Sequence, residues 1–346
     1  MNILFIGLYP PHIGGIATHT FHLRQRLEER GHEVHVVTYA HEGALPDDRV
    51  HMVDTSMRMR GISFIRKAPS VASSVIEEHG IDIIHSHFVA PPGYVGNGLA
   101  KNHGIPHVTT AHGSDINFMS KEFVGKFLIS STLKHADAVI CVSKDLKRRV
   151  EERTKAPVHY IPNGVDMTQF YPSDEKKEYI LYVGALTEQK RVDEIIDALE
   201  GTGERLVVAG DGPERPRLMW LARQRNVDAE FLGYTTDVPS LMRRAKLLVQ
   251  PSKEEGFGLT VLEAMASGVP TIARKRPALE EIVEHEVNGL LFPCFKVFRR
   301  ELEALRSDES LRAELAREGL ETAKKFSWKC VAERTEEVYK TLSRKD

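Results

Sequence analysis

Short apolar runs alternate with longer amphipathic segments along the chain. Residues 2–8 are almost continuously apolar, which predicts a strand buried on both faces. A turn rich in proline and glycine follows at residues 10–15. A helix is then expected over residues 16–30, ending at Gly31, before a strand over residues 33–39. Strand, helix and strand in this order predict a parallel sheet.

The same alternation continues to the end of the chain. In the first half, further strands are expected over residues 81–87, 107–111, 138–142 and 159–161. In the second half, strands are expected over residues 179–183, 205–209, 229–232, 247–250 and 271–273. Helices are predicted over residues 191–199 and from residue 259 to just before Gly268, and the chain is expected to be helical from residue 299 to the end.

Residues 162–175 contain Pro162, Gly164 and Pro172 with little periodicity, and this stretch is interpreted as a linker. The pattern therefore predicts two Rossmann-like, doubly wound α/β domains, residues 1–167 and 168–328. A last helix, residues 329–346, is expected to pack back toward the N-terminal domain. Ligands of such folds bind at the carboxyl ends of strands, so a cleft between two facing domains is the expected active site.

Composition fits a folded protein without an extended charged surface. The 346 residues are 41% apolar and 28% charged, with a formal net charge of −2, which argues against nucleic acid as a partner. No apolar run reaches the roughly 18 residues of a membrane span. The N-terminus has neither a basic flank nor a cleavage site, and the three cysteines are widely spaced. Both features predict a cytoplasmic protein.

Two loops in the first half offer candidate chemistry. Gly14 and Gly15 lie between the first strand and the first helix, where backbone N–H groups and the helix dipole suit a phosphate. A tight turn without a ligand explains the same residues. The segment from Thr110 to Asp115 lies at another strand end, and His112 and Asp115 could bind sugar hydroxyls.

Two loops in the second half carry charge. Lys190 follows the strand that ends near Gly184 and precedes a helix, so it could meet a diphosphate, although a solvated surface lysine is the simpler interpretation. Glu255 lies in a glycine-rich loop, and Glu263 lies eight residues later inside an apolar helix. A carboxylate in apolar surroundings is costly unless it is paired, so the two acids are candidate functional groups. Glycosidases also use two carboxylates, so the pair alone does not fix the reaction.

Taken in order, these motifs resemble glycosyltransferase family 4, the glycosyl transferases group 1 superfamily, of the GT-B fold. Residues 255–270 are similar to the Glu-x7-Glu signature of that family. Further similar segments are the glycine pair at 14–15, residues 161–166, 210–213 and 288–291, and Phe326-Ser327-Trp328. The resemblance covers nearly the whole chain.

The resemblance implies a role for each matching residue. Gly14 and Gly15 approach the donor phosphate, Lys190 with Arg191 holds the diphosphate after Gly184, and His112 lies beside the transferred sugar. Glu255 binds sugar hydroxyls and Glu263 the ribose hydroxyls. The backbone of the loop between them contacts the sugar and phosphate, and the base is held near Tyr234; the remaining donor-binding residues are Gly256, Phe257, Gly258, Leu259 and Thr260. The catalytic residues are thus expected to be His112, Lys190 and Glu255.

Two departures from the family pattern concern the phosphate site. Ala185 stands where the family often has an arginine, so either Lys190 and Arg191 carry the diphosphate together or the donor is held more weakly. Residues 274–277 read Arg-Lys-Arg-Pro where the family often has Gly-Gly before the proline. This basic stretch could bind phosphate or could be an ordinary charged loop.

The resemblance implies a retaining, hexosyltransferase-type reaction from a UDP- or GDP-sugar, with no cofactor. No Asp-x-Asp occurs in the sequence, so fixed protein charges are expected to replace a metal ion. UDP-glucose, UDP-N-acetylglucosamine and GDP-mannose are all plausible donors. Members of the family glycosylate lipids, polysaccharides and small metabolites, and all three kinds of acceptor stay open.

Three other functions are compatible with parts of the sequence. His85 and His87 lie on one face of a strand, as in a metal hydrolase, but the spacing reveals no third ligand, and a polar cluster at the strand end is the preferred interpretation. A UDP-sugar 2-epimerase and a non-catalytic nucleotide-sugar-binding protein are the alternatives within related folds. Separately, residues 57–68 combine basic and apolar side chains without an acid, which is typical of peripheral membrane contact and equally of a solvated helix end.

Overall fold

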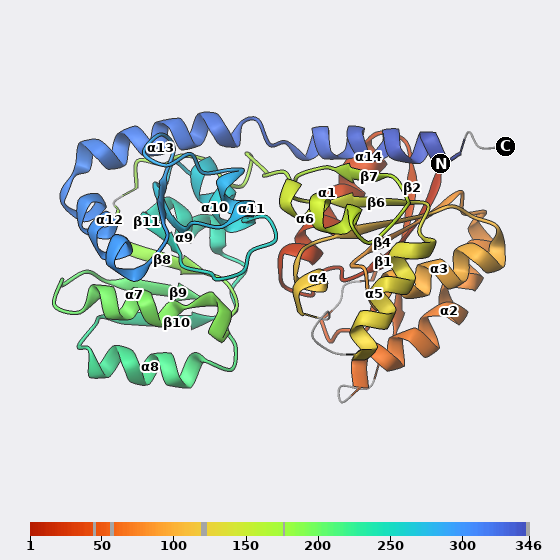
Figure 1. Ribbon diagram of the computed structural model, residues 1–346, viewed down its shortest axis with the longest axis horizontal. Coiled ribbons are helices and arrows are strands. Elements are labelled where there is room, and N and C mark those ends of the chain that lie inside the picture. Colours follow the sequence, from red (N-terminus) through yellow and green to blue (C-terminus); the bar gives the residue numbers. More distant parts are fainter. Residues whose placement is uncertain (44–45, 56–58, 119–122, 176, 344–346) are drawn as a thin grey trace. The chain divides into compact units, whose positions relative to one another are not determined.

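The computed structural model describes residues 1–43, 46–55, 59–118, 123–175 and 177–343, in two compact units (Figure 1). Unit 1 comprises Met1–Gly164 and Trp328–Asp346, and unit 2 comprises Val165–Ser327. The first division falls slightly before the boundary expected after residue 167. Val165 pairs with Ser327 in an isolated bridge, which holds the start and the end of unit 2 together.

Unit 1 is built on a seven-stranded parallel sheet in the order β3-β2-β1-β4-β5-β6-β7. The strands are β1 (Asn2–Gly7), β2 (Glu33–Tyr39), β3 (Val50–Val53), β4 (Ile83–His87), β5 (His107–Ala111), β6 (Ala138–Cys141) and β7 (Val158–Tyr160). The chain reverses its direction of winding between β1 and β4. At such a switch point the loops diverge and leave room for a ligand.

Helices cover both faces of this sheet because side chains of a strand point alternately to its two faces. Ile3 and Phe5 of β1 pack with α1 (Gly15–Glu29) and α14 (Trp328–Leu342). Leu4 and Ile6 pack on the other face with α2 (Arg60–His79) and α3 (Pro92–His103). The remaining helices of unit 1 are α4 (Ser114–Phe118), α5 (Phe123–His135) and α6 (Lys144–Glu151).

The C-terminal helix α14 belongs to unit 1, although it is the last element of the chain, and it lies along α1 (Figure 1). Its apolar face is buried in the same core as β1, and Trp328 at its start is 2% exposed. Two polar contacts add to this packing. The Tyr339 hydroxyl bonds to His85 in the core, and Arg30 of the α1 end pairs with Glu336. Apolar packing and polar contacts therefore both hold α14 on the rest of unit 1.

Unit 2 contains a six-stranded parallel sheet in the order β10-β9-β8-β11-β12-β13, with a second switch point between β8 and β11. Its strands are β8 (Tyr179–Val183), β9 (Leu206–Ala209), β10 (Ala229–Gly233), β11 (Ala245–Gln250), β12 (Thr271–Arg274) and β13 (Leu290–Phe292). Its helices are η3 (Glu188–Lys190), α7 (Val192–Leu199), α8 (Arg215–Gln224), α9 (Val238–Arg244), α10 (Leu259–Ala266), α11 (Pro277–Glu280), α12 (Phe295–Ser307) and α13 (Glu309–Ala323). Both units thus have the predicted Rossmann-like, doubly wound architecture.

The structure is helical over most of the region from residue 299 onward, as expected, and divides it into three separate helices, α12, α13 and α14. Asp308 ends α12 and caps α13 by accepting a hydrogen bond from the Leu311 N–H at 2.9 Å. A second break at Phe326 and Ser327 precedes α14. An aspartate is a common first residue of a helix, so Asp308 signals the break. The helical pattern of the residues before and after it hides that signal in the sequence.

Two strands were not predicted, β3 and β13, and both are short. β3 has only four residues, of which His51 interrupts the apolar run, and β13 has only three. Neither is long enough to produce a clear periodic pattern. In the described part of the chain, no helix is long and apolar enough to cross a lipid bilayer.

Candidate active site

In unit 2 most of the predicted donor residues lie after β8 and after β11, two neighbouring strands of the sheet. The loops after β8 and β9 approach each other so closely that a Cβ on Gly210 would lie 1.9 Å from the Gly184 carbonyl oxygen. Gly210 has a φ of 151°, which L side chains rarely adopt. Glycine is therefore required at Gly210, and the contact fixes the loop from which Lys190 projects.

Lys190 and Glu255 meet at the carboxyl edge of this sheet. Lys190 Nζ donates to Glu255 Oε2 at 2.8 Å, and Gln250 Nε2 donates to the same oxygen at 2.9 Å. Both charged side chains are partly exposed, 23% for Lys190 and 16% for Glu255. Within the described residues, Glu255 Oε1 has no hydrogen-bond partner. The pair therefore joins two of the predicted residues and leaves each able to bind a ligand.

Glu263 lies one turn inside α10 and is half-buried. Desolvation raises the pKa of its carboxyl group to about 8. In the part of the chain that the structure describes, this carboxyl group has neither a hydrogen bond nor an ion pair. A desolvated acid without a partner is destabilising unless a ligand satisfies it, which makes Glu263 a candidate binding residue.

The start of α10 is also free for a ligand. Gly258 is its N-cap, with a φ of 102°, and no side chain caps the first turn. The N–H groups at Leu259 and Thr260 thus belong to an uncapped helix start with partial positive charge. Phe257 is 3% exposed and packs its ring against Phe326, so it can offer only backbone groups.

Arg191 and Arg274, two other cations near this edge, have partners inside unit 2. Arg191 donates to Asp193 at 3.0 Å and pairs with Glu194 at 3.0 Å. Arg274 is buried, pairs with Glu194 and donates to the Pro251 carbonyl oxygen at 2.8 Å. These contacts are structural and stabilise the start of α7 against the end of β12.

The other two basic side chains of residues 274–277 also have partners within unit 2. Lys275 pairs with Glu280 at 3.3 Å, and Arg276 donates to the Lys253 carbonyl oxygen at 2.6 Å. Ala185 is exposed and places no charge at the edge. Tyr234, expected near the base, follows β10 and is 63% exposed. Lys190 is therefore the cation best placed for a diphosphate.

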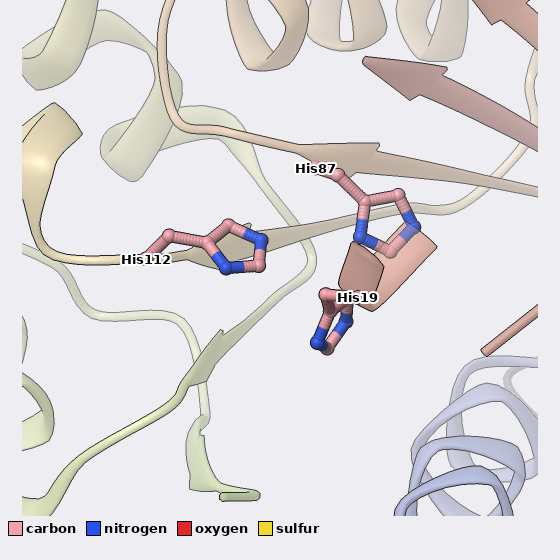
Figure 2. Close-up of side chains that lie close together, drawn as sticks. All are labelled: His19, His87 and His112. Atoms are coloured by element: carbon pink, nitrogen blue, oxygen red, sulfur yellow. The ribbon is translucent and has the colours of Figure 1, made fainter. Parts of the chain in front are cut away.

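In unit 1 the structure brings together three histidines from distant parts of the chain (Figure 2). His19 comes from α1, His87 ends β4 and His112 follows β5. One ring nitrogen of each lies within 4.8 Å of the others. The sheet order explains the contact, because β1, β4 and β5 are neighbours and their carboxyl ends share one edge. We call these three residues the carboxyl-edge triad.

The carboxyl-edge triad is buried, neutral and incompletely hydrogen-bonded. Burial lowers the pKa of His19 to about 4 and holds the pKa values of His87 and His112 well below 6.5. His19 Nδ1–H donates a hydrogen bond to Asn163 Oδ1 at 2.8 Å, which leaves the lone pair on Nε2. His19 Nε2, His112 Nε2 and both nitrogens of His87 have no partner among the described residues. Such atoms are suited to a hydroxyl group or a metal ion.

The triad gives His87 two neighbouring histidines that the spacing along the sequence does not reveal. The partners of His87 come from other elements rather than from the strand itself. His85 is separate from the triad: it bonds to Tyr339 and, through Nε2 at 2.7 Å, to Thr110. His85 is therefore a structural core residue, and of the two only His87 lies in the site.

Asp115 positions the loop that carries His112. Its buried carboxylate accepts hydrogen bonds from the backbone N–H groups of Val89, His112, Gly113 and Ile116 at 2.8 to 3.2 Å. These bonds occupy the oxygens that were expected to bind sugar. Gly14 and Gly15 are exposed at the start of α1, where no side chain caps the helix.

The segment proposed for membrane contact is only partly available. Residues 57 and 58 lie outside the described residues. Phe64 and Ala68 are buried in the core, and the Arg60 guanidinium lies 4.9 Å from the ring centre of Tyr39. Ile62 is 50% exposed. Membrane contact stays a prediction, and liposome flotation that is independent of anionic lipid would contradict it.

Comparison with known proteins shows the family of the chain. Glycosyltransferase Family 4 matches residues 13–169, and Glycosyl transferases group 1 matches residues 166–322. The uncharacterized glycosyltransferase MJ1178 of Methanocaldococcus jannaschii is 35% identical, with 99% of each chain covered. This protein belongs to glycosyltransferase family 4. The predicted family is confirmed, and as a member this glycosyltransferase uses a nucleotide-sugar donor.

More distant relatives of the glycosyltransferase support the same fold. N-acetyl-alpha-D-glucosaminyl L-malate synthase of Bacillus anthracis is 27% identical over 81% of each chain. Among solved structures, sucrose-phosphate synthase from Thermosynechococcus elongatus has a TM-score of 0.89 and 21% identity, with 99% of each chain covered. Anabaena HepE in complex with UDP-glucose has a TM-score of 0.83 and 20% identity, covering 99% of this chain and 100% of that one. These structures confirm the GT-B fold.

Proposed function

We propose that this glycosyltransferase transfers a hexosyl group from a nucleoside-diphosphate sugar to an acceptor hydroxyl, with retention of configuration and without a metal ion. The observation that carries the proposal is the Lys190–Glu255 pair, 2.8 Å between Nζ and Oε2, at the switch point of unit 2. A cation beside an acid with a free oxygen suits a ligand that has a diphosphate next to sugar hydroxyls.

Lys190 would stabilise the departing diphosphate. Negative charge grows on the phosphate oxygen as the glycosidic bond breaks, and a fixed ammonium group stabilises that charge more in the transition state than in the ground state. The uncapped start of α10 would add N–H donors and the helix dipole. We infer that Lys190 stabilises the diphosphate without help from Arg191, because Arg191 is paired with Asp193 and Glu194.

The two acids would divide the donor between them. Glu255 Oε1 would accept a hydrogen bond from a hydroxyl of the transferred sugar, while Oε2 keeps its bond to Lys190. Glu263 would accept hydrogen bonds from the ribose hydroxyls. Because its pKa is about 8, a share of Glu263 must lose a proton when the nucleotide binds near neutral pH.

The carboxyl-edge triad would act on uncharged groups. A neutral imidazole can accept from or donate to a hydroxyl, and it does not compete with Lys190 for the diphosphate. We propose that His112 contacts a hydroxyl of the transferred sugar and that His19 and His87 contact the same substrate or the acceptor. The N–H groups at Gly14 and Gly15 would meet the donor phosphate.

In the proposed step, the bond from the anomeric carbon to the phosphate oxygen breaks and the carbon becomes oxocarbenium-like. The acceptor oxygen attacks the same face, a new carbon–oxygen bond forms, and the acceptor proton moves to the departing phosphate oxygen. No separate general base is needed. Front-face attack leaves the configuration at the anomeric carbon unchanged.

A donor panel in EDTA tests this function. The solved HepE complex contains UDP-glucose, so UDP-glucose is the first donor to test, followed by UDP-N-acetylglucosamine and GDP-mannose. Turnover is followed as nucleoside diphosphate released with sugar, lipid-linked and small-metabolite acceptors, and the product anomer is assigned by NMR. We expect turnover in EDTA and a retained anomer. Turnover that requires added Mg²⁺ or Mn²⁺, or an inverted product, would contradict the proposal.

A further inference from the structure

A second group of histidines lies in unit 1, away from the carboxyl-edge triad. His35 is near the start of β2, His51 is in β3 and His79 is the last residue of α2. His51 is in register with Val37, so its side chain lies on the same face of the sheet as His35, two residues earlier in β2. We call His35, His51 and His79 the amino-edge triad.

We propose that the amino-edge triad binds a divalent transition-metal ion such as Zn²⁺. One ring nitrogen of each histidine lies within 4.8 Å of the others. His35 Nδ1 and His51 Nε2 are 3.2 Å apart. Zinc–nitrogen bonds of about 2.0–2.1 Å in a tetrahedron place neighbouring nitrogens roughly 3.3 Å apart. Two of the three ligand atoms are therefore already at the spacing of a tetrahedral site.

His79 would supply the third nitrogen. Its ring stacks on that of His35, with centroids 4.0 Å apart and planes inclined by 25°. The ring must turn to direct its lone pair toward the same point as the other two. Its side chain is 28% exposed and lies at the end of a helix, so this rotation meets little resistance from the core.

Glu33 prepares His35 as a ligand. Its carboxylate oxygen Oε1 is 3.0 Å from His35 Nε2 and accepts a hydrogen bond from that N–H. The proton is thereby held on Nε2, and Nδ1, which faces His51, keeps its lone pair. An imidazole held between a carboxylate and a metal ion is the usual outer-shell arrangement of zinc sites.

The ligand set also selects the kind of ion. Three imidazoles suit Zn²⁺, Co²⁺, Ni²⁺ or Cu²⁺, whereas Mg²⁺ and Ca²⁺ prefer oxygen ligands. The fourth position would be taken by water or by Glu78, whose Oε2 is 4.0 Å from His79 Nε2 and whose side chain is 75% exposed. An ion here would connect β2, β3 and α2, and would stabilise unit 1. This inference does not depend on the proposed function.

Cobalt binding tests the site, because tetrahedral Co²⁺ has strong visible absorption. The full chain, without a polyhistidine tag and treated with EDTA, is titrated with Co²⁺, and its melting temperature is measured with and without Zn²⁺. We expect one tetrahedral Co²⁺ per chain and a higher melting temperature with Zn²⁺. His51→Ala and His79→Ala should each weaken binding at least tenfold, and Glu33→Gln roughly tenfold.

Two controls separate this site from other histidines. His135→Ala removes an exposed histidine of the same unit and should leave Co²⁺ binding unchanged. His87→Ala removes a member of the carboxyl-edge triad and should also retain the absorption. The inference is overturned if wild-type protein shows no tetrahedral Co²⁺ spectrum, if the spectrum survives in both His51→Ala and His79→Ala, or if His87→Ala abolishes it.

Discussion

The two units have the same architecture and place different chemistry at the same point of it. Each is a parallel sheet whose winding reverses next to its first strand, and each gathers its candidate residues at the carboxyl ends of the strands around that reversal. In unit 2 Lys190 and Glu255 form an ion pair, and Glu263 is an acid whose pKa desolvation raises to about 8. In unit 1 they are neutral imidazoles, held uncharged by burial.

The difference teaches how one fold can serve two parts of a transfer reaction. A departing diphosphate carries developing charge, and only a fixed opposite charge or an aligned dipole stabilises it. A sugar or acceptor hydroxyl is uncharged, and a neutral imidazole can bond to it without the desolvation cost of a buried charge. The four predictions below test this division between charged and neutral sites.

The largest effect is expected from Lys190→Ala. Loss of the Lys190 ammonium group removes charge stabilisation from the departing diphosphate, so kcat/KM should fall roughly 100- to 1000-fold. Steady-state release of nucleoside diphosphate measures the change, and circular dichroism checks that the fold survives. Lys253→Ala, which removes an exposed lysine of the same loop region, is the matched control and should behave as wild type. A Lys190→Ala enzyme with near wild-type kcat/KM would mean that the diphosphate site is wrongly placed.

A smaller effect is expected from His112→Ala, and it should appear in kcat rather than in nucleotide affinity. The neutral imidazole is proposed to contact a sugar hydroxyl, so kcat should fall roughly 10- to 100-fold while the Kd of the free nucleoside diphosphate stays unchanged. Calorimetry gives the Kd and steady-state kinetics gives kcat. His103→Ala, which alters a half-buried histidine bonded to Ser73, serves as control. An equal loss in kcat and in nucleotide affinity would contradict the division between the two units.

Glu263→Gln is expected to weaken nucleotide binding roughly tenfold, because an amide accepts hydrogen bonds from the ribose less strongly than a carboxylate. It also has an effect on stability with a defined sign. The pKa of Glu263 is about 8 in the folded protein and ordinarily 4.5, so the folded state holds a proton that the unfolded state has lost. The free energy of unfolding should therefore fall as pH rises from about 4.5 to about 8, and change no further above that range on account of this group.

Denaturant unfolding at several pH values measures this slope, and Glu263→Gln should reduce it. Calorimetry in buffers of different ionisation enthalpy should also show a proton released when nucleotide binds to the wild type at pH 7. Neither a reduced slope nor proton release would be found if Glu263 were an ordinary ionised surface acid.

The smallest effect on catalysis is expected from Tyr339→Phe. The change removes the hydroxyl that bonds to His85 and leaves a buried imidazole nitrogen without that partner, at a cost of about 1–3 kcal/mol in the free energy of unfolding. Urea unfolding measures the loss. Because His85 and Tyr339 lie in the core rather than in the site, kcat and KM should not change. If kcat or KM changed by more than the loss of stability accounts for, His85 would belong to the site.

The sequence predicted what local pattern and local motifs determine. The Glu255–Glu263 spacing, Lys190 and the alternation of strands and helices were all readable along the chain. His19 and His87 were not recognised as partners of His112, because their contact depends on the order of strands in the sheet. The same reason hid the amino-edge triad, whose members come from two neighbouring strands and a helix end.

Two other differences have physical causes that the sequence only partly reveals. Arg191, a candidate for the diphosphate, is paired with Asp193 and Glu194, acids so close in sequence that the contacts could have been anticipated. The pairing of Arg274 with Glu194 joins β12 to α7 and could not be foreseen without the fold. Ion pairs between distant elements decide which cations stay free for a ligand.

The most direct test of the central claim is thermal-shift measurement with UDP, GDP, ADP and their sugar derivatives, with EDTA present throughout. A ligand that binds only the folded state raises the melting temperature. The account predicts a rise with one nucleotide that survives EDTA and is lost in Lys190→Ala. No rise with any nucleotide in EDTA, together with a rise when Mg²⁺ is supplied, would contradict a donor site built from fixed protein charges.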